Sequence, residues 1–367
     1  MGADAQSAIN EIFILLGLGL GVILLRSYAR WQAVGFRRWE ADDYLMIVAM
    51  GVYTAESVLA SHVVTQYDGL ANNGMTDDER ATLDPDSDEY RKRVGGSKTQ
   101  VPGWVMYVLL LWIIKAALCT MFLRLTERLG TYRRRIFIGF GLISVTWLVV
   151  TLCILFGCTP MEKNWQINPN PGLNCQPASS RINVFVTLAL NVATDIYLLT
   201  IPVPMLWSAN IKLWKKLGLI VLFSGGIFVM MAGILRCVLI LANDVTGAQD
   251  GSAWAVRETF VAVVTSNVPL IFPLVRTWLG SWVGSFSSRK ESRSGRTGVP
   301  HGSIPLPDRS WKGREEAYSS PSNAFAFTGS RERIIDPPSR GIKVEMNVEV
   351  NRDKTVGKDR PDSDSDF

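Results

Sequence analysis

Six polar or charged side chains lie inside long apolar stretches of the sequence, where water is not expected to reach them. They are Glu56, Lys115, Asn191, Asp195, Arg236 and Glu258. An ionisable group costs about 2.5–3.5 kcal/mol near the centre of a bilayer, so such groups usually face the protein interior and pair with one another. Two interpretations stay open: these side chains line a cavity for a ligand, an ion or a substrate, or they form ion pairs that fix helix register.

Lys115 and Asp195 have opposite charges at similar depth. Each lies about halfway along its own apolar stretch, so we expect a salt bridge between them. Asn191 lies one helical turn before Asp195 and shares its face.

Glu56, Arg236 and Glu258 fall in the outer third of their stretches, so we expect a second polar cluster that faces the exterior. A carboxylate already bridged to a base is a poor proton donor, whereas an unpaired one in an apolar pocket can act as a general acid. Asp195, Glu56 and Glu258 are therefore the candidates if the protein is an enzyme, and the pairing of each decides its suitability.

A third group of charges lies at the opposite end of the predicted helices. Asp42 and Asp43 begin one stretch, and Arg124 ends another, so we expect them to meet. The Asp43–Arg124 pair has two readings: a fixed interfacial contact, or a latch that breaks on activation.

The elements that position these residues are seven apolar stretches, each long enough to cross a bilayer as a helix. They are residues 8–29, 41–63, 102–123, 136–156, 182–206, 217–241 and 258–275. The fourth has no charged residue, whereas helices of soluble proteins carry a polar stripe. The sequence therefore predicts an all-α seven-transmembrane helix bundle at 8–279, followed by a disordered cytosolic tail at 280–367, rich in Ser, Arg, Pro and Gly.

The positive-inside rule predicts an external N-terminus, in a multi-pass protein of the plasma membrane. Basic residues concentrate in the loops after the first, third and fifth stretches: Arg26, Arg30, Arg37, Arg38, Arg124, Arg128, Arg133, Arg134, Arg135, Lys212, Lys215 and Lys216. The outer loop at 64–101 also contains five basic residues, but long loops count less in this rule. This loop is a solvated insertion or a lid over the bundle, and its acidity favours the first.

Two cysteines bracket the next outer loop. Cys158 and Cys175 are expected to form a disulfide in an oxidising exterior, the alternative being two free thiols.

The sequence lacks the motifs of several common chemistries. There is no phosphate-binding loop and no zinc-ligand spacing, and residues 258–275 contain no lysine that could hold retinal. We therefore assign no catalytic residue, no metal and no cofactor, and expect no nucleic acid as a partner.

Ordered motifs resemble those of the fungal rhodopsin-domain integral membrane proteins. They are Trp39-Glu40-Ala41-Asp42-Asp43-Tyr44, Lys115 with Phe122-Leu123-Arg124-Leu125, Cys158-Thr159-Pro160 with Trp165 and Cys175, Asn191 with Asp195 and Pro202-Val203-Pro204-Met205-Leu206-Trp207, and Arg236 with Asp244-Val245-Thr246, Trp254, Glu258 and Pro269. The resemblance covers about residues 10–280. The chain departs from the family at residues 67–74, where a Gly-x-Gly-x-His pattern is common.

The resemblance implies a receptor-like seven-helix protein, since some members resemble surface sensors coupled to G proteins. Others occur with secondary-metabolite gene clusters. We expect a sensor of an extracellular or membrane-borne cue, with the lipid bilayer, an unknown small-molecule ligand and a cytosolic signalling partner as its partners. The alternatives are an intramembrane cyclase or isomerase, and an accessory protein of a secondary-metabolite pathway.

Overall fold

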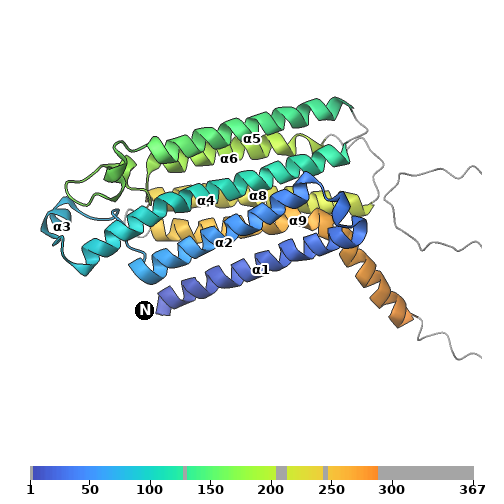
Figure 1. Cartoon of the computed structure of the whole chain (residues 1–367), viewed down its shortest axis with the longest axis horizontal. Coiled ribbons are helices and arrows are strands. Elements are labelled where there is room, and N and C mark those ends of the chain that lie inside the picture. Colours follow the sequence, from blue (N-terminus) through green and yellow to red (C-terminus); the bar gives the residue numbers. More distant parts are fainter. Residues whose placement is uncertain (1–2, 127–129, 204–212, 243–246, 288–367) are drawn as a thin grey trace, which may run out of the picture. The chain divides into compact units, whose positions relative to one another are not determined.

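The computed structural model describes residues 3–126, 130–203, 213–242 and 247–287, all of which lie in one compact unit. Within these ranges the regular elements are all helical. The seven long helices are α1 (Ala3–Val34), α2 (Ala41–Tyr67), α4 (Asp88–Leu125), α5 (Gly130–Phe156), α6 (Arg181–Leu199), α8 (Leu213–Ala242) and α9 (Gly247–Ser287) (Figure 1). Each contains a segment long and apolar enough to span a bilayer, as the sequence predicts.

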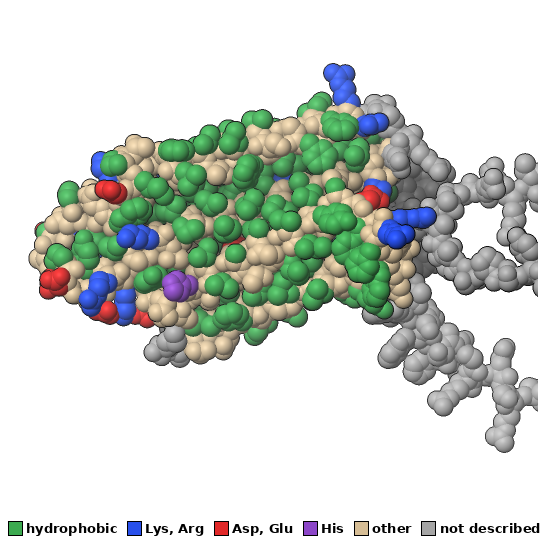
Figure 2. Space-filling model, in the orientation of Figure 1, with side chains coloured by type: hydrophobic (Ala, Val, Ile, Leu, Met, Phe, Trp, Pro, Cys, Tyr) green, Lys and Arg blue, Asp and Glu red, His purple; other side chains and the backbone are tan. Residues whose placement is uncertain are grey.

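Helix α4 lies at the centre of the bundle. It packs against α2 and α5 and also contacts α6 and α9, while α1 closes the bundle against α2 and α9. Large apolar side chains point outward along the flanks of the bundle, which is the arrangement that lipid as a solvent requires (Figure 2). Among the most exposed are Phe13, Leu18, Leu24, Val145, Leu148, Phe185, Met231 and Val238.

Several helices extend beyond the apolar stretches that predict them. Helix α4 begins at Asp88 instead of residue 102, and α9 begins at Gly247 instead of residue 258. The added turns are polar, so hydropathy alone could not include them. Helix α9 continues to Ser287, past the predicted end of the helical domain at residue 279, and the predicted tail beyond it lies outside the described residues.

The two ends of the bundle differ, and we name each by its residues. The disulfide end contains Cys158 and Cys175, together with the short helices α3 (Asp77–Thr82), η2 (Met161–Trp165) and η3 (Leu173–Cys175). The Arg26 end contains Arg26 and the helix η1 (Phe36–Arg38). Which end faces the cytosol remains a prediction from the basic loops.

The predicted outer loop is folded, although its acidic part at 76–89 is largely exposed to solvent, as expected for a solvated insertion. Asn72 and Arg80 are almost fully buried, and residues 83–101 largely belong to α4. The segment after α2 turns at Asp68, which has a left-handed φ of 51°, and then lies directly on α4. A Cβ at Gly96 would overlap the carbonyl oxygen of Leu70, so only glycine permits this approach.

Candidate functional site

A cavity of about 720 Å³ lies at the disulfide end of the bundle. Helices α1, α2, α4, α8 and α9 form its walls together with the segment at 68–74. Most of its lining is small and apolar: Ala5, Ala8, Ile12, Leu59, Ala60, Val63, Val64, Gly103, Ile240, Ala248 and Val256. Its charged lining residues include Glu56 and Arg236, two of the six groups singled out in the sequence.

Two aromatic rings of α4 hold Arg236 in the cavity wall. The guanidinium carbon lies 4.7 Å from the ring centroid of Trp104 and 4.2 Å from that of Tyr107. Trp104 is itself fixed, because its indole Nε1 donates to the carbonyl of Pro177 at 2.8 Å. A cation stacked on desolvated aromatic faces gains about 2 kcal/mol or more, which helps to compensate for its burial.

The two carboxylates of this region are buried and incompletely partnered. Glu56 is 6% exposed, and its Oε2 has no hydrogen-bond partner among the described residues. Glu258 is fully buried; its carboxylate interacts with the hydroxyl of Tyr107, but neither oxygen has a hydrogen bond of standard geometry to a described residue. The side chain of Glu258 lies against α8, where a Cβ at Gly233 would come within 3.3 Å of its Oε1. Gly233 therefore leaves room for this carboxylate, and Glu56, Glu258 and Arg236 act on one another electrostatically.

The expected pair of Lys115 and Asp195 is present in the middle of the bundle. Lys115 Nζ lies 2.6 Å from Asp195 Oδ1 and donates to the carbonyl of Asn191 and to the hydroxyl of Thr194, both at 2.8 Å. The ammonium thus has three oxygen acceptors, and a small cavity of about 60 Å³ adjoins the pair. Asn191 contributes its backbone rather than its side chain to this site.

The Arg26 end contains a network of three arginines and three acids, within which Arg26, Asp42 and Asp43 are buried. Arg26 is 2% exposed and lies 2.6 Å from Asp42 Oδ2 and 3.3 Å from Asp43 Oδ1. Arg30 bonds both carboxylate oxygens of Asp43. Arg124 reaches Asp42 Oδ1 at 3.4 Å.

Arg124 meets Asp42, as expected, but the predicted Asp43–Arg124 pair is wrong in its partner. Asp43 is occupied by Arg26 and Arg30, and Arg124 binds Asp42 and Glu40. We placed Arg26 in a basic loop, whereas α1 continues to Val34 and presents Arg26 to the start of α2.

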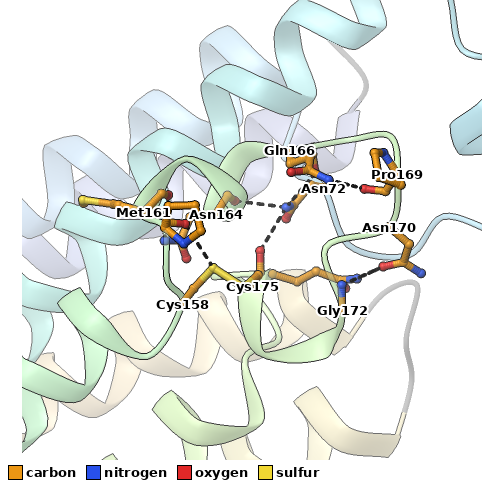
Figure 3. Close-up of a disulfide and its surroundings, with 11 residues drawn as sticks. Asn72, Cys158, Met161, Asn164, Gln166, Pro169, Asn170, Gly172 and Cys175 are labelled. Atoms are coloured by element: carbon orange, nitrogen blue, oxygen red, sulfur yellow. Dashed lines mark hydrogen bonds between the residues drawn. A yellow bond between two sulfur atoms is a disulfide. The ribbon is translucent and has the colours of Figure 1, made fainter.

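The disulfide between Cys158 and Cys175 is confirmed, and a cap is built on it (Figure 3). The side-chain amide nitrogen Nδ2 of Asn72 donates to the backbone carbonyls of Asn164, Gln166 and Cys175 at 3.0–3.3 Å. This cap consists of α3, the segment at 68–74 and the disulfide loop, and it lies beside the cavity.

Arg80 of α3 connects parts of this cap from its buried side. It donates to the carbonyls of Asn72 at 2.6 Å and Ile167 at 3.1 Å. Burial lowers the pKa of its guanidinium from the ordinary value, and the carbonyl acceptors offset part of the cost of burying the charge.

A further ion pair lies at the mouth of the cavity. Arg257 of α9 binds both carboxylate oxygens of Glu11 of α1, with Nε at 2.5 Å from Oε1 and Nη2 at 3.0 Å from Oε2. Both side chains are about 40% exposed, so water or lipid headgroups reach this pair.

One family model matches more than half of this chain. The model of the fungal rhodopsin domain matches residues 25–277, which include α2 to α8, the disulfide loop and most of α9. The chain belongs to this family. The fungal rhodopsin domain thus contains both the buried network at the Arg26 end and the cavity residues Glu56, Arg236 and Glu258.

Two curated proteins are similar to this fungal rhodopsin-domain chain. One is a SAT4 family membrane protein of Emericella nidulans, 28% identical over 48% of this chain and 45% of its own length. The other is the polyenoic acids biosynthesis gene cluster protein Ba17b of Metarhizium anisopliae, 24% identical over 93% of this chain and 94% of its own length. The chain thus spans less than half of the first relative. No solved structure matches it.

Sequence reasoning missed the aromatic side chains of this fungal rhodopsin-domain site. Trp104 and Tyr107 look like ordinary core residues in an apolar stretch. Their signal was positional, because residues 104, 107, 111 and 115 recur at the spacing of one helix face, the face that carries Lys115. Gly233 could have been linked to Arg236 by the same i, i+3 spacing.

Proposed function

We propose that this protein is a receptor-like membrane protein that binds a small molecule in the cavity at the disulfide end. The observation that carries this proposal is the cavity of about 720 Å³, in whose wall Glu56 leaves a buried carboxylate oxygen without a partner. Ligand sites are typically apolar clefts of about 300–1,000 Å³ with a few polar groups that orient the ligand. In lipid, an incompletely partnered charge at this position costs free energy unless another group compensates it.

The two ends suit the two tasks of a receptor. With the orientation predicted from the basic loops, the disulfide and the cavity face an oxidising exterior, and the network around Arg26 faces the cytosol. Ligand binding would then shift the packing of α1, α2 and α9, which line the cavity and of which α1 and α2 also hold the network. A cytosolic signalling partner and a plasma-membrane location belong to this proposal.

The test is a deletion strain of the source fungus, complemented with the wild-type chain, with Glu56→Gln or with Ala60→Leu. Ala60 lines the cavity, so the larger side chain fills it without changing its charge. We expect both variants to reach the membrane and to lose the surface response that the wild type restores. The matched control is Glu162→Gln, an exposed carboxylate in η2 outside the cavity lining. A full response from both cavity variants would refute the proposal.

A second function is favoured by the same unpartnered carboxylates. Glu56 and Glu258 meet the requirement for a general acid, whereas Asp195 is bridged to Lys115. The relative that matches over most of this chain is named for a biosynthesis gene cluster. An intramembrane cyclase or isomerase predicts that Glu258→Gln abolishes one metabolite while its precursor accumulates in the strain. Unchanged metabolites with an altered surface response would exclude it.

A further inference from the structure

Charge is balanced in three other ion-pair groups of the described helices. At the Arg26 end, Arg26, Arg30 and Arg124 meet Glu40, Asp42 and Asp43. In the middle, Lys115 meets Asp195, and at the mouth of the cavity Arg257 meets Glu11. Each of these groups is neutral when all its members are ionised.

The cavity cluster differs, because Glu56 and Glu258 share one cation, Arg236. None of the ion pairs among the described residues includes Arg236, whose guanidinium is stacked on the rings of Trp104 and Tyr107. Three carboxylate oxygens of the two acids are buried without a hydrogen bond of standard geometry to any residue that the structure describes. An unpaired buried carboxylate is costly unless a proton or a cation compensates it. With both carboxylates ionised, the site therefore has a net charge of −1, which a proton or a bound cation can neutralise.

We propose that the cavity takes an amphipathic amine, whose ammonium group supplies the neutralising positive charge; this deepens, and rests on, the receptor function proposed above. The ammonium binds Glu56, which lines the cavity, with Glu258 as the further negative charge behind it. An ammonium group offers three N–H donors, enough to partner the free oxygen of Glu56. The apolar part of the ligand lies among the small side chains of α1 and α2, which include Ala8, Leu59 and Ala60.

An anionic head group fits the same site poorly. A carboxylate bound at Arg236 would bring a third negative charge beside Glu56 and Glu258, and would compete with two aromatic rings for the guanidinium. Like charges in a desolvated site repel strongly, because the local dielectric screens them weakly. A neutral alcohol would satisfy hydrogen bonds but leave the charge imbalance in place.

The experiment uses the full chain in nanodiscs of uncharged phosphatidylcholine and three probes with one common tail: phenylbutylamine, phenylbutanol and phenylbutyrate. Binding is measured by the shift in thermal unfolding temperature and by titration. We expect the amine to bind most tightly and Glu56→Gln to weaken it at least about tenfold, the loss of about 1.4 kcal/mol of interaction. Glu162→Gln is the matched control and should bind the amine like the wild type.

Two further variants keep the result interpretable. Ala60→Leu retains every charge and should lose the amine by filling the cavity, and Arg236→Met, if folded by size-exclusion chromatography, tests whether an anionic probe binds at the guanidinium. Amine binding that Glu56→Gln leaves unchanged would overturn the proposal. Phenylbutyrate bound more tightly, with binding lost in Arg236→Met, would overturn the amine while leaving the receptor function intact. No binding of any probe up to about 1 mM would overturn both.

Discussion

The two ends of this bundle treat buried charge in opposite ways. At the Arg26 end, all four carboxylate oxygens of Asp42 and Asp43 bind arginine at 2.6–3.4 Å. At the disulfide end, Glu56 and Glu258 have three buried oxygens without a hydrogen bond of standard geometry to a described residue, next to a large cavity. Paired charges fix how α1, α2 and α4 pack, whereas the incompletely partnered carboxylates beside the cavity are the groups that we propose bind a ligand. Burial alone would not have separated the two groups, since both are almost completely buried.

The largest effect is expected at the Arg26 end. Asp42→Asn removes one carboxylate and leaves Arg26 buried with one acid fewer, so the free energy of unfolding should fall by about 3–5 kcal/mol. Unfolding of the purified protein in mixed micelles measures this value.

The control for this variant is Glu89→Gln. It breaks an exposed i, i+4 pair with Arg93, which should cost less than about 1 kcal/mol. If Asp42→Asn unfolds like the control, the network around Arg26 does not hold the helices together.

The second effect tests whether the disulfide end needs a covalent connection because it lacks such a network. The bond between Cys158 and Cys175 closes a loop with a sequence separation of 17, so the double variant Cys158→Ser with Cys175→Ser should lose about 3 kcal/mol of stability. Cys153→Ser, which removes a free thiol, is the control. Hydrogen exchange should locate the loss in the cap, and a uniform loss over all helices would contradict this reading.

The sequence could predict the charges that had one possible partner. In lipid, Lys115 needs an acid at its own depth, and Asp195 was the candidate at that depth, so the pair followed from hydropathy and position. Arg26 has several possible partners near one end of the bundle, and only the length of α1 brings it to Asp42. Position along a stretch therefore predicts a pair only where candidates are few.

The cap lay further beyond sequence reasoning. Asn72 binds backbone carbonyls between 92 and 103 residues away, and Arg80 binds one 87 residues away. Backbone acceptors leave no mark in the sequence, because every residue carries a carbonyl group. The acidic composition of the loop indicated solvent, and most of residues 76–89 are exposed, but composition gave no sign of the buried contacts of Asn72 and Arg80.

The third prediction compares the stability effect of a substitution in the cavity wall with that of a substitution at the Arg26 end. Glu56→Gln removes a carboxylate with an unpartnered oxygen, so stability should stay the same or rise by about 1 kcal/mol, in contrast to the fall expected for Asp42→Asn. The same unfolding assay without ligand measures both variants side by side. A fall of about 3 kcal/mol or more would mean that Glu56 is a structural partner, and the difference between the two ends would disappear.

The smallest effect concerns the cap beside the cavity, at Glu79 on α3. Its carboxylate accepts from the backbone N–H of Thr76 at 2.8 Å, and the Thr76 hydroxyl accepts from the N–H of Glu79 at 3.3 Å. The bonds from Thr76 hold the pKa of Glu79 below its ordinary value. A carboxyl with a lower pKa in the folded state stabilises that state when ionised, and the stabilisation is lost as the pH falls through the folded pKa, hence below about 4.3. A nitroxide at Thr82→Cys should be more mobile at about pH 3 than at about pH 6, with the change below about pH 4.3, and Glu79→Gln should remove this dependence. If the label moves equally in both proteins, groups other than this helix cap hold α3 in place. The pH dependence of the disulfide end would then belong to the exposed acids around it.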